Sequence, residues 1–177
     1  MDPANPMISP QRGFDAAEFA VRTERAQRQM AASGIAGVLL MTEAEVRYFS
    51  GFQTLFWQSP TRPWFLFVPT AGKPIAVIPE IGAALMRRTW IDDIRTWSAP
   101  APADDGVSLL AALLAPLAPG GGTLGVMKGH ETQLRMPLGD WERLTAKCCA
   151  DGGLVLDVGV NFGYYALYAA RLGCRVV

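Results

Sequence analysis

Two nearly continuous apolar runs, Trp64 to Val68 and Ile75 to Ile78, are joined by a short turn that contains a glycine. A strand that is buried on one face alternates apolar and polar residues, whereas a strand covered on both faces reads as unbroken apolar sequence. The two runs therefore predict a β-hairpin at the centre of a sheet that carries helices on both sides.

The rest of the chain alternates predicted helices with predicted strands. Asp15 and Glu18, and then Thr42 and Glu45, have the three-residue spacing of a capping box at a helix start. This alternation predicts an α/β fold with a mixed β-sheet and helices on both faces. Helices are expected over 15–33, 42–51, 81–90, 107–117 and 137–147, and further strands over 35–41, 94–97 and 124–127.

Composition limits the kind of partner and the compartment. The 177 residues carry 16 basic and 16 acidic side chains with no basic run, which argues against a nucleic acid or an anionic membrane as partner. The longest apolar stretch is too short to span a bilayer. Three cysteines, two of them adjacent, fit no disulfide or zinc pattern, so we expect reduced thiols and a cytoplasmic location.

We expect three segments along the chain. Residues 1–14 are predicted to be a loose tail, residues 15–150 an α/β domain, and residues 151–177 a separate piece. The last boundary is placed at a run of glycines, where a polar helix gives way to a glycine-rich loop pattern.

No residue pattern predicts catalysis or a metal site. His130 is the chain's one histidine, and no histidine partner at ligand spacing accompanies it, so a plain loop role is the favoured interpretation. The pairs Asp92-Asp93 and Asp104-Asp105 are each adjacent in sequence, and adjacent side chains point apart, so we expect solvated carboxylates or helix caps.

The loop from Phe52 to Arg62 is the best candidate for binding. It carries Phe56, Trp57 and Arg62, and aromatic residues and arginine are enriched at binding hot spots. The alternative interpretation is that Phe56 and Trp57 are core residues that lie beneath the loop.

The segment from about Arg22 to Lys147 resembles the N-terminal domain of the creatinase, prolidase and aminopeptidase P family. The resemblance rests on the order of elements, with RAQRQMAASGIAGVLLMTEAEVRYFSGF followed by a hairpin that ends in VIPE and then by RTWIDDIRTW. A strand in a GTLGV context and a closing helix complete it.

The resemblance implies a domain that performs no chemistry itself. In that family a separate domain holds two divalent metals with carboxylate and histidine ligands, and we expect that domain to be absent from this chain, leaving the chain without a cofactor. The N-terminal domain covers an active site and helps to build a homodimer. By that analogy the residues that face a substrate or a partner subunit are Tyr48, Phe56, Trp57 and Arg62.

Residues 154–177 resemble instead the first motif of an FkbM-type S-adenosylmethionine-dependent methyltransferase. The sequence LVLDVGVNFG has the small residues of a Rossmann-like first turn, which lets the backbone approach a ligand. The resemblance implies a truncated β-α-β fragment, because the acidic residue that would hold the ribose falls beyond Val177. S-adenosylmethionine would therefore bind only to a complete version of this segment. A plain β-α-β piece that completes the fold is the alternative. The implied cofactor-lining residues are Asp157, Gly159, Asn161 and Gly163.

Overall fold

The computed structural model describes residues 13–59, 62–117, 122–127, 131–149, 154–158 and 175–176. His130 and three members of the predicted cofactor loop, Gly159, Asn161 and Gly163, lie outside these ranges, as does most of the predicted N-terminal tail. Among the described residues, no helix has the length and apolar character needed to cross a membrane.

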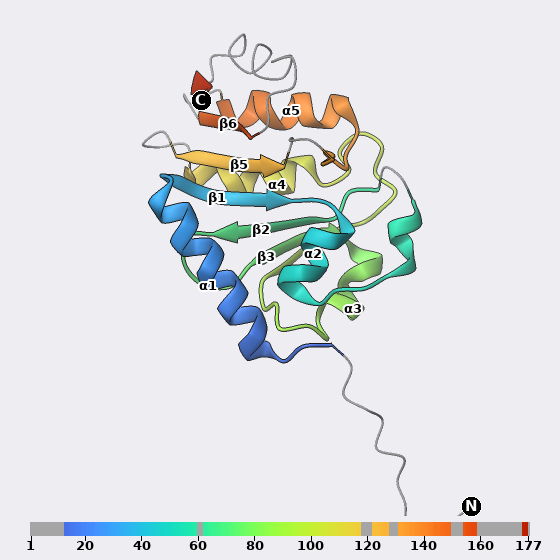
Figure 1. Cartoon of the computed structure of the whole chain (residues 1–177). Helices are drawn as coiled ribbons and strands as arrows, with labels where there is room; N and C mark the ends of the chain where they lie inside the picture. Colours follow the sequence, from blue (N-terminus) through green and yellow to red (C-terminus); the bar gives the residue numbers. More distant parts are fainter. Residues whose placement is uncertain are drawn as a thin grey trace, which may run out of the picture.

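The described strands form one mixed sheet in the order β4-β3-β2-β1-β5-β6-β7 (Figure 1). The β1–β2 and β2–β3 pairs are antiparallel, and the other neighbouring pairs are parallel. The mixed α/β sheet is therefore confirmed. The strands are β1 (Ile35–Leu40), β2 (Phe65–Pro69), β3 (Ile75–Pro79), β4 (Ile94–Trp97), β5 (Thr123–Met127), β6 (Leu154–Val158) and β7 (Arg175–Val176).

Helices lie on both faces of the sheet (Figure 1). One face packs against α1, α2 and α3, and the other packs against α4 and α5. The helical segments are α1 (Ala16–Ala32), α2 (Glu43–Ser50), η1 (Leu55–Gln58), η2 (Glu80–Gly82), α3 (Ala83–Met86), α4 (Val107–Leu114), η3 (Ala115–Leu117) and α5 (Leu138–Cys149).

The unbroken apolar sequence of the hairpin has a direct structural cause. Phe65 and Phe67 of β2 belong to the core beneath α4 and α5, while Leu66 and Val68 belong to the core beneath α1, α2 and α3. Each successive side chain therefore enters a different core, and both need apolar residues. The hairpin lies inside the sheet as predicted, although β1 rather than the hairpin occupies the middle position.

Both predicted helix starts are confirmed. The Asp15 carboxylate accepts a hydrogen bond from the Glu18 amide at 2.8 Å, and Thr42 and Glu45 form a complete capping box. The α2 helix ends at Gly51, whose φ of 74° is the left-handed conformation that glycine adopts most readily.

The helix predicted over 81–90 is wrong in length, because α3 ends at Met86. After that residue the amides of Arg88 and Thr89 bond to carbonyls three residues back, and the Thr89 hydroxyl donates to the Met86 carbonyl at 2.7 Å. The Trp90 indole then donates to the carbonyl of Phe49 at 2.7 Å. These bonds turn the chain away from the helical path and attach it to α2.

The predicted boundary at residue 151 falls between α5 and β6. The β6 strand pairs in parallel with β5, so it belongs to the same sheet. The β7 strand in turn pairs in parallel with β6. The boundary itself stays a prediction.

Candidate functional site

The aromatic loop begins after α2 and runs through η1 to the start of β2. The β1 strand ends where α2 begins, and β2 runs antiparallel to β1, so the loop lies at the carboxyl edge of β1 and β5. In α/β sheets this is the edge at which ligands are most often bound. Topology therefore brings the predicted binding loop to the favoured edge.

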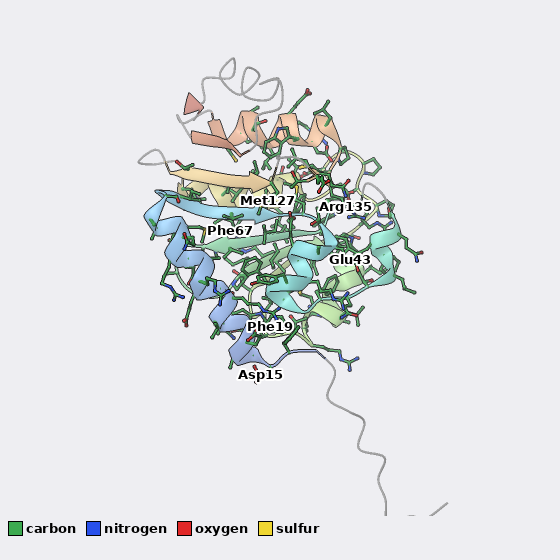
Figure 2. All side chains as sticks on the ribbon, viewed as in Figure 1. Asp15, Phe19, Glu43, Phe67, Met127 and Arg135 are labelled. Atoms are coloured by element: carbon green, nitrogen blue, oxygen red, sulfur yellow. The ribbon has the colours of Figure 1, made fainter. Side chains whose placement is uncertain are left out.

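Arg135, labelled in Figure 2, lies in the segment between β5 and α5 and attaches that segment to the loop. Its guanidinium donates to the backbone carbonyls of Trp57, Ser59 and Arg62, the first of them at 3.1 Å. It also lies 4.8 Å from the centre of the Trp57 ring, which is cation–π distance. A single buried cation thus satisfies three carbonyls of a loop that has little regular structure of its own.

Burial lowers the pKa of Arg135, and the negative charge of Glu43 opposes that shift. The side chain is 6% exposed. A guanidinium stays protonated even when buried, so its charge must be balanced by hydrogen bonds and by nearby carboxylates. The carbonyls of the loop serve that purpose, which ties the conformation of the loop to the presence of Arg135.

The residues of the predicted binding loop differ in their exposure. Trp57 is buried at 8% exposure and is part of the core, as the alternative interpretation held. Phe56 is 38% exposed and stacks on buried Trp64 with ring centres 6.3 Å apart. The Arg62 guanidinium lies 5.8 Å from the centre of the Phe56 ring. Phe56 and Arg62 therefore share one surface.

Tyr48 belongs to a different place on the molecule. Its ring is 44% exposed on α2 and packs against Arg22 of α1, whose guanidinium carbon lies 4.7 Å from the ring centre. An open pocket of about 770 Å³ lies here, between the amino end of α1, α2 and the turn that follows α3. Sequence reasoning named Tyr48 but not the pocket, because three separate segments build it.

Exposed apolar side chains lie on two segments that contact Trp64. Leu55, beside it in η1, is 82% exposed, and Ile81 and Leu85 are 56% and 42% exposed. Phe56 stacks on Trp64, and a Cβ at Gly82 would lie only 2.3 Å from the same indole ring. Both segments therefore contact the Trp64 ring. We call Leu55, Phe56, Ile81 and Leu85 the Trp64 surface.

Three of the four paired carboxylates are exposed or cap a helix, as expected, whereas Asp105 is half-buried and accepts an indole hydrogen bond. Asp92 pairs with Lys73 at 2.7 Å, and Asp93 pairs with Arg95 at 3.0 Å. Asp104 accepts the amide of Ser108 at the start of α4, and Asp105 accepts the Trp97 indole. Within the described ranges, no group of three or more His, Cys, Asp or Glu side chains is placed to hold a metal ion.

Comparison with known proteins identifies the family to which this chain belongs. The family model described as the creatinase/prolidase N-terminal domain matches residues 22–155, more than half of the chain. The search of curated proteins found no match.

Similar solved structures share the fold. A prolidase from Thermococcus sibiricus is 20% identical with a TM-score of 0.60, over 81% of this chain and 35% of that chain. The dipeptidase PepE from Mycobacterium ulcerans is 23% identical with a TM-score of 0.55, over 75% and 34%. The N-terminal domain of an X-Pro dipeptidase from Streptococcus pyogenes is 14% identical with a TM-score of 0.56, over 76% and 97%.

The chain thus spans about a third of the length of the first two of these proteins and almost the whole of the isolated domain. The family model also reaches past the predicted end of the resemblance at Lys147 and into β6. By its sequence match and its fold, the chain belongs to the creatinase/prolidase N-terminal domain family.

Proposed function

We propose that this chain is the non-catalytic N-terminal domain of an Xaa-Pro peptidase-type hydrolase, and that it serves subunit assembly and covers an active site. Family membership supports the first part. The observation that carries the assembly role is the Trp64 surface, whose four large apolar side chains are exposed and whose Phe56 ring lies next to Arg62. Apolar patches with adjacent aromatic and arginine side chains are typical of protein–protein interfaces.

The same surface supports the covering role. The loop that carries Phe56 and Arg62 lies at the carboxyl edge of β1 and β5, and Arg135 holds its backbone in one conformation. A rigid loop loses less conformational entropy when a partner or substrate binds it, so more of the contact energy contributes to affinity. In this proposal the two divalent metals of hydrolysis belong to another domain, and the protein is a cytoplasmic homodimer.

Hydrolysis assays test the non-catalytic part of the proposal. The 177-residue chain, incubated with an Xaa-Pro dipeptide and Mn²⁺, Co²⁺ or Zn²⁺, is expected to release no proline above the rate of a chelator-treated control. Metal-dependent release that persists through a second purification step would contradict a non-catalytic role.

One observation favours a second candidate, a fragment of a methyltransferase. The strands β6 and β7 are parallel neighbours, as a β-α-β unit requires, and Asp157 lies in β6. The form of this candidate in which the first motif alone binds the cofactor predicts that S-adenosylmethionine gives heat on calorimetric titration and that Asp157→Ala removes it, with Asp92→Ala as a surface control. A flat titration of the unmodified chain would rule out cofactor binding by the first motif alone.

A further inference from the structure

The open pocket between α1, α2 and the turn after α3 has an unbalanced charge. Its lining includes three arginines, Arg22, Arg47 and Arg88, and no aspartate or glutamate. The whole chain is balanced, with 16 basic and 16 acidic side chains, so the excess is local. The amino end of α1, where Figure 2 labels Asp15 and Phe19, marks one wall of the pocket.

Arg22 is already engaged. Its Nε donates to Glu18 at 2.9 Å, and its Nη1 donates to the Tyr48 carbonyl at 2.9 Å. The guanidinium carbon lies 4.1 Å from the centre of the Phe14 ring. Arg22 therefore holds the wall of the pocket together, and Glu18 offsets its charge.

The charges of Arg47 and Arg88 are not offset by any carboxylate that the structure describes. Neither forms an ion pair with any carboxylate in the part of the chain that the structure describes. Arg47 is fixed by a neutral group, because the Gln53 amide oxygen accepts from its Nε at 3.2 Å and from a terminal nitrogen at 3.1 Å when the amide is oriented to satisfy both side chains. Its charge is therefore held in place without being neutralised.

Aromatic rings form a further part of the lining. Phe14 is 62% exposed and Tyr48 is 44% exposed. Trp90 is held by its indole bond to the Phe49 carbonyl and stacks on Phe19 with ring centres 6.2 Å apart. Exposed rings that are fixed by their neighbours offer stacking surface at low entropic cost.

We propose that this pocket binds an organic oxyanion, with its carboxylate or phosphate group at Arg47 and Arg88 and a planar ring against the parts of the Tyr48 and Phe14 rings that Arg22 leaves exposed. The guanidinium fork matches the geometry of both oxyanions, and neither arginine would have to break an ion pair to bind one. The site shares no residue with the Trp64 surface and does not rest on the assembly role proposed above.

The neighbouring Arg87 provides a matched control. Arg87 and Arg88 both follow α3 and are both exposed, yet only Arg88 lines the pocket. Benzoate and phenyl phosphate serve as probes of the two oxyanions, and benzyl alcohol serves as the uncharged probe. Amide chemical shifts of the full chain report binding, and thermal melting confirms that each variant is folded.

We expect at least one oxyanion probe to shift the amides of α2 and residues 88–90, and benzyl alcohol to bind far more weakly. Arg88→Gln and Arg47→Gln should each weaken binding about 10-fold or more, because each removes charge-assisted hydrogen bonds, while Arg87→Gln leaves it unchanged. Preference for benzoate or for phenyl phosphate identifies the oxyanion. Absence of binding by both, or equal loss in the Arg87 and Arg88 variants, would overturn the site.

Discussion

The guanidinium of Arg135 lies 4.8 Å from the centre of the Trp57 ring and donates to the Trp57 carbonyl at 3.1 Å. One residue thus holds both the side chain and the backbone of its partner, 78 positions away in sequence. Because the same guanidinium also bonds to the carbonyls of Ser59 and Arg62, the shape of the aromatic loop depends on it.

Replacing Arg135 should therefore be costly. Arg135→Met leaves three loop carbonyls without their charged donor, and we expect the free energy of unfolding to fall by about 2–4 kcal/mol in urea titration. Arg25→Met, at an exposed position of α1, is the control and should change it by less than about 0.5 kcal/mol. Similar small changes in both variants would show that the loop does not depend on Arg135.

Alanine substitutions at two glycines distinguish the cost of backbone strain from the cost of a steric clash. Gly51 and Gly72 have φ values of 74° and 83°, but a Cβ at Gly51 would lie 2.8 Å from the Phe19 ring, whereas a Cβ at Gly72 would meet open space. Gly72→Ala should cost about 1–2 kcal/mol from the left-handed backbone alone, and Gly51→Ala clearly more. Equal costs in denaturant titration would mean that Phe19 moves aside freely.

Asp104 should stabilise α4 in a pH-dependent way. A backbone hydrogen bond from Ser108 is the main cause of the lowered pKa of Asp104, so the folded state favours the ionised carboxylate. Its stabilisation is complete above the ordinary aspartate pKa of about 4 and is lost as the pH falls through the lower folded value.

We expect Asp104→Ala to lower the free energy of unfolding by about 0.5–1 kcal/mol at pH 7, the low end of capping effects because the group is exposed. The difference from the unmodified chain should shrink as the pH falls below about 4. A difference that is constant from pH 7 to pH 3 would contradict a role for the ionised group.

Cys148 should react slowly with alkylating reagents. Burial raises the pKa of its thiol to about 11, and only the thiolate is a good nucleophile. In a Cys149→Ser, Cys174→Ser background, the rate of reaction with iodoacetamide should still be rising at pH 10. The same chain unfolded in urea should level off near the ordinary thiol pKa of about 8.5. A folded chain that levels off there too would mean that the thiol is solvated.

Local signals in the sequence predicted local structure well. The caps at Asp15 and Thr42 depend on residues three positions away. The unbroken apolar run of the hairpin indicated that both of its faces are buried. The end of α3 was missed because a threonine hydroxyl and a distant carbonyl decide it, while the apolar residues up to Trp90 still fit a helix.

The sequence predicts the candidate site only in part, because contacts between residues far apart in the chain define it. Phe56 and Arg62 were chosen by residue type and do share a surface, but Trp57, chosen on the same ground, is buried. The sequence gives one weak indication that Arg135 is buried, because it lies between Leu134 and Met136. Both neighbours pack into the core beneath α4 and α5. Its carbonyl partners, 73 to 78 residues away, follow no spacing that a sequence reveals.

The association state of the chain tests the proposed assembly role most directly. Sedimentation equilibrium of the unmodified chain at micromolar concentrations should give the mass of a dimer. Leu55→Glu combined with Ile81→Glu should give a monomer, because the two changes place charges on the Trp64 surface without disturbing the core. Val21→Glu, at a position that is 49% exposed on α1, should remain dimeric. A monomeric unmodified chain at every concentration, or a double variant that dimerises as well as the control, would contradict the account.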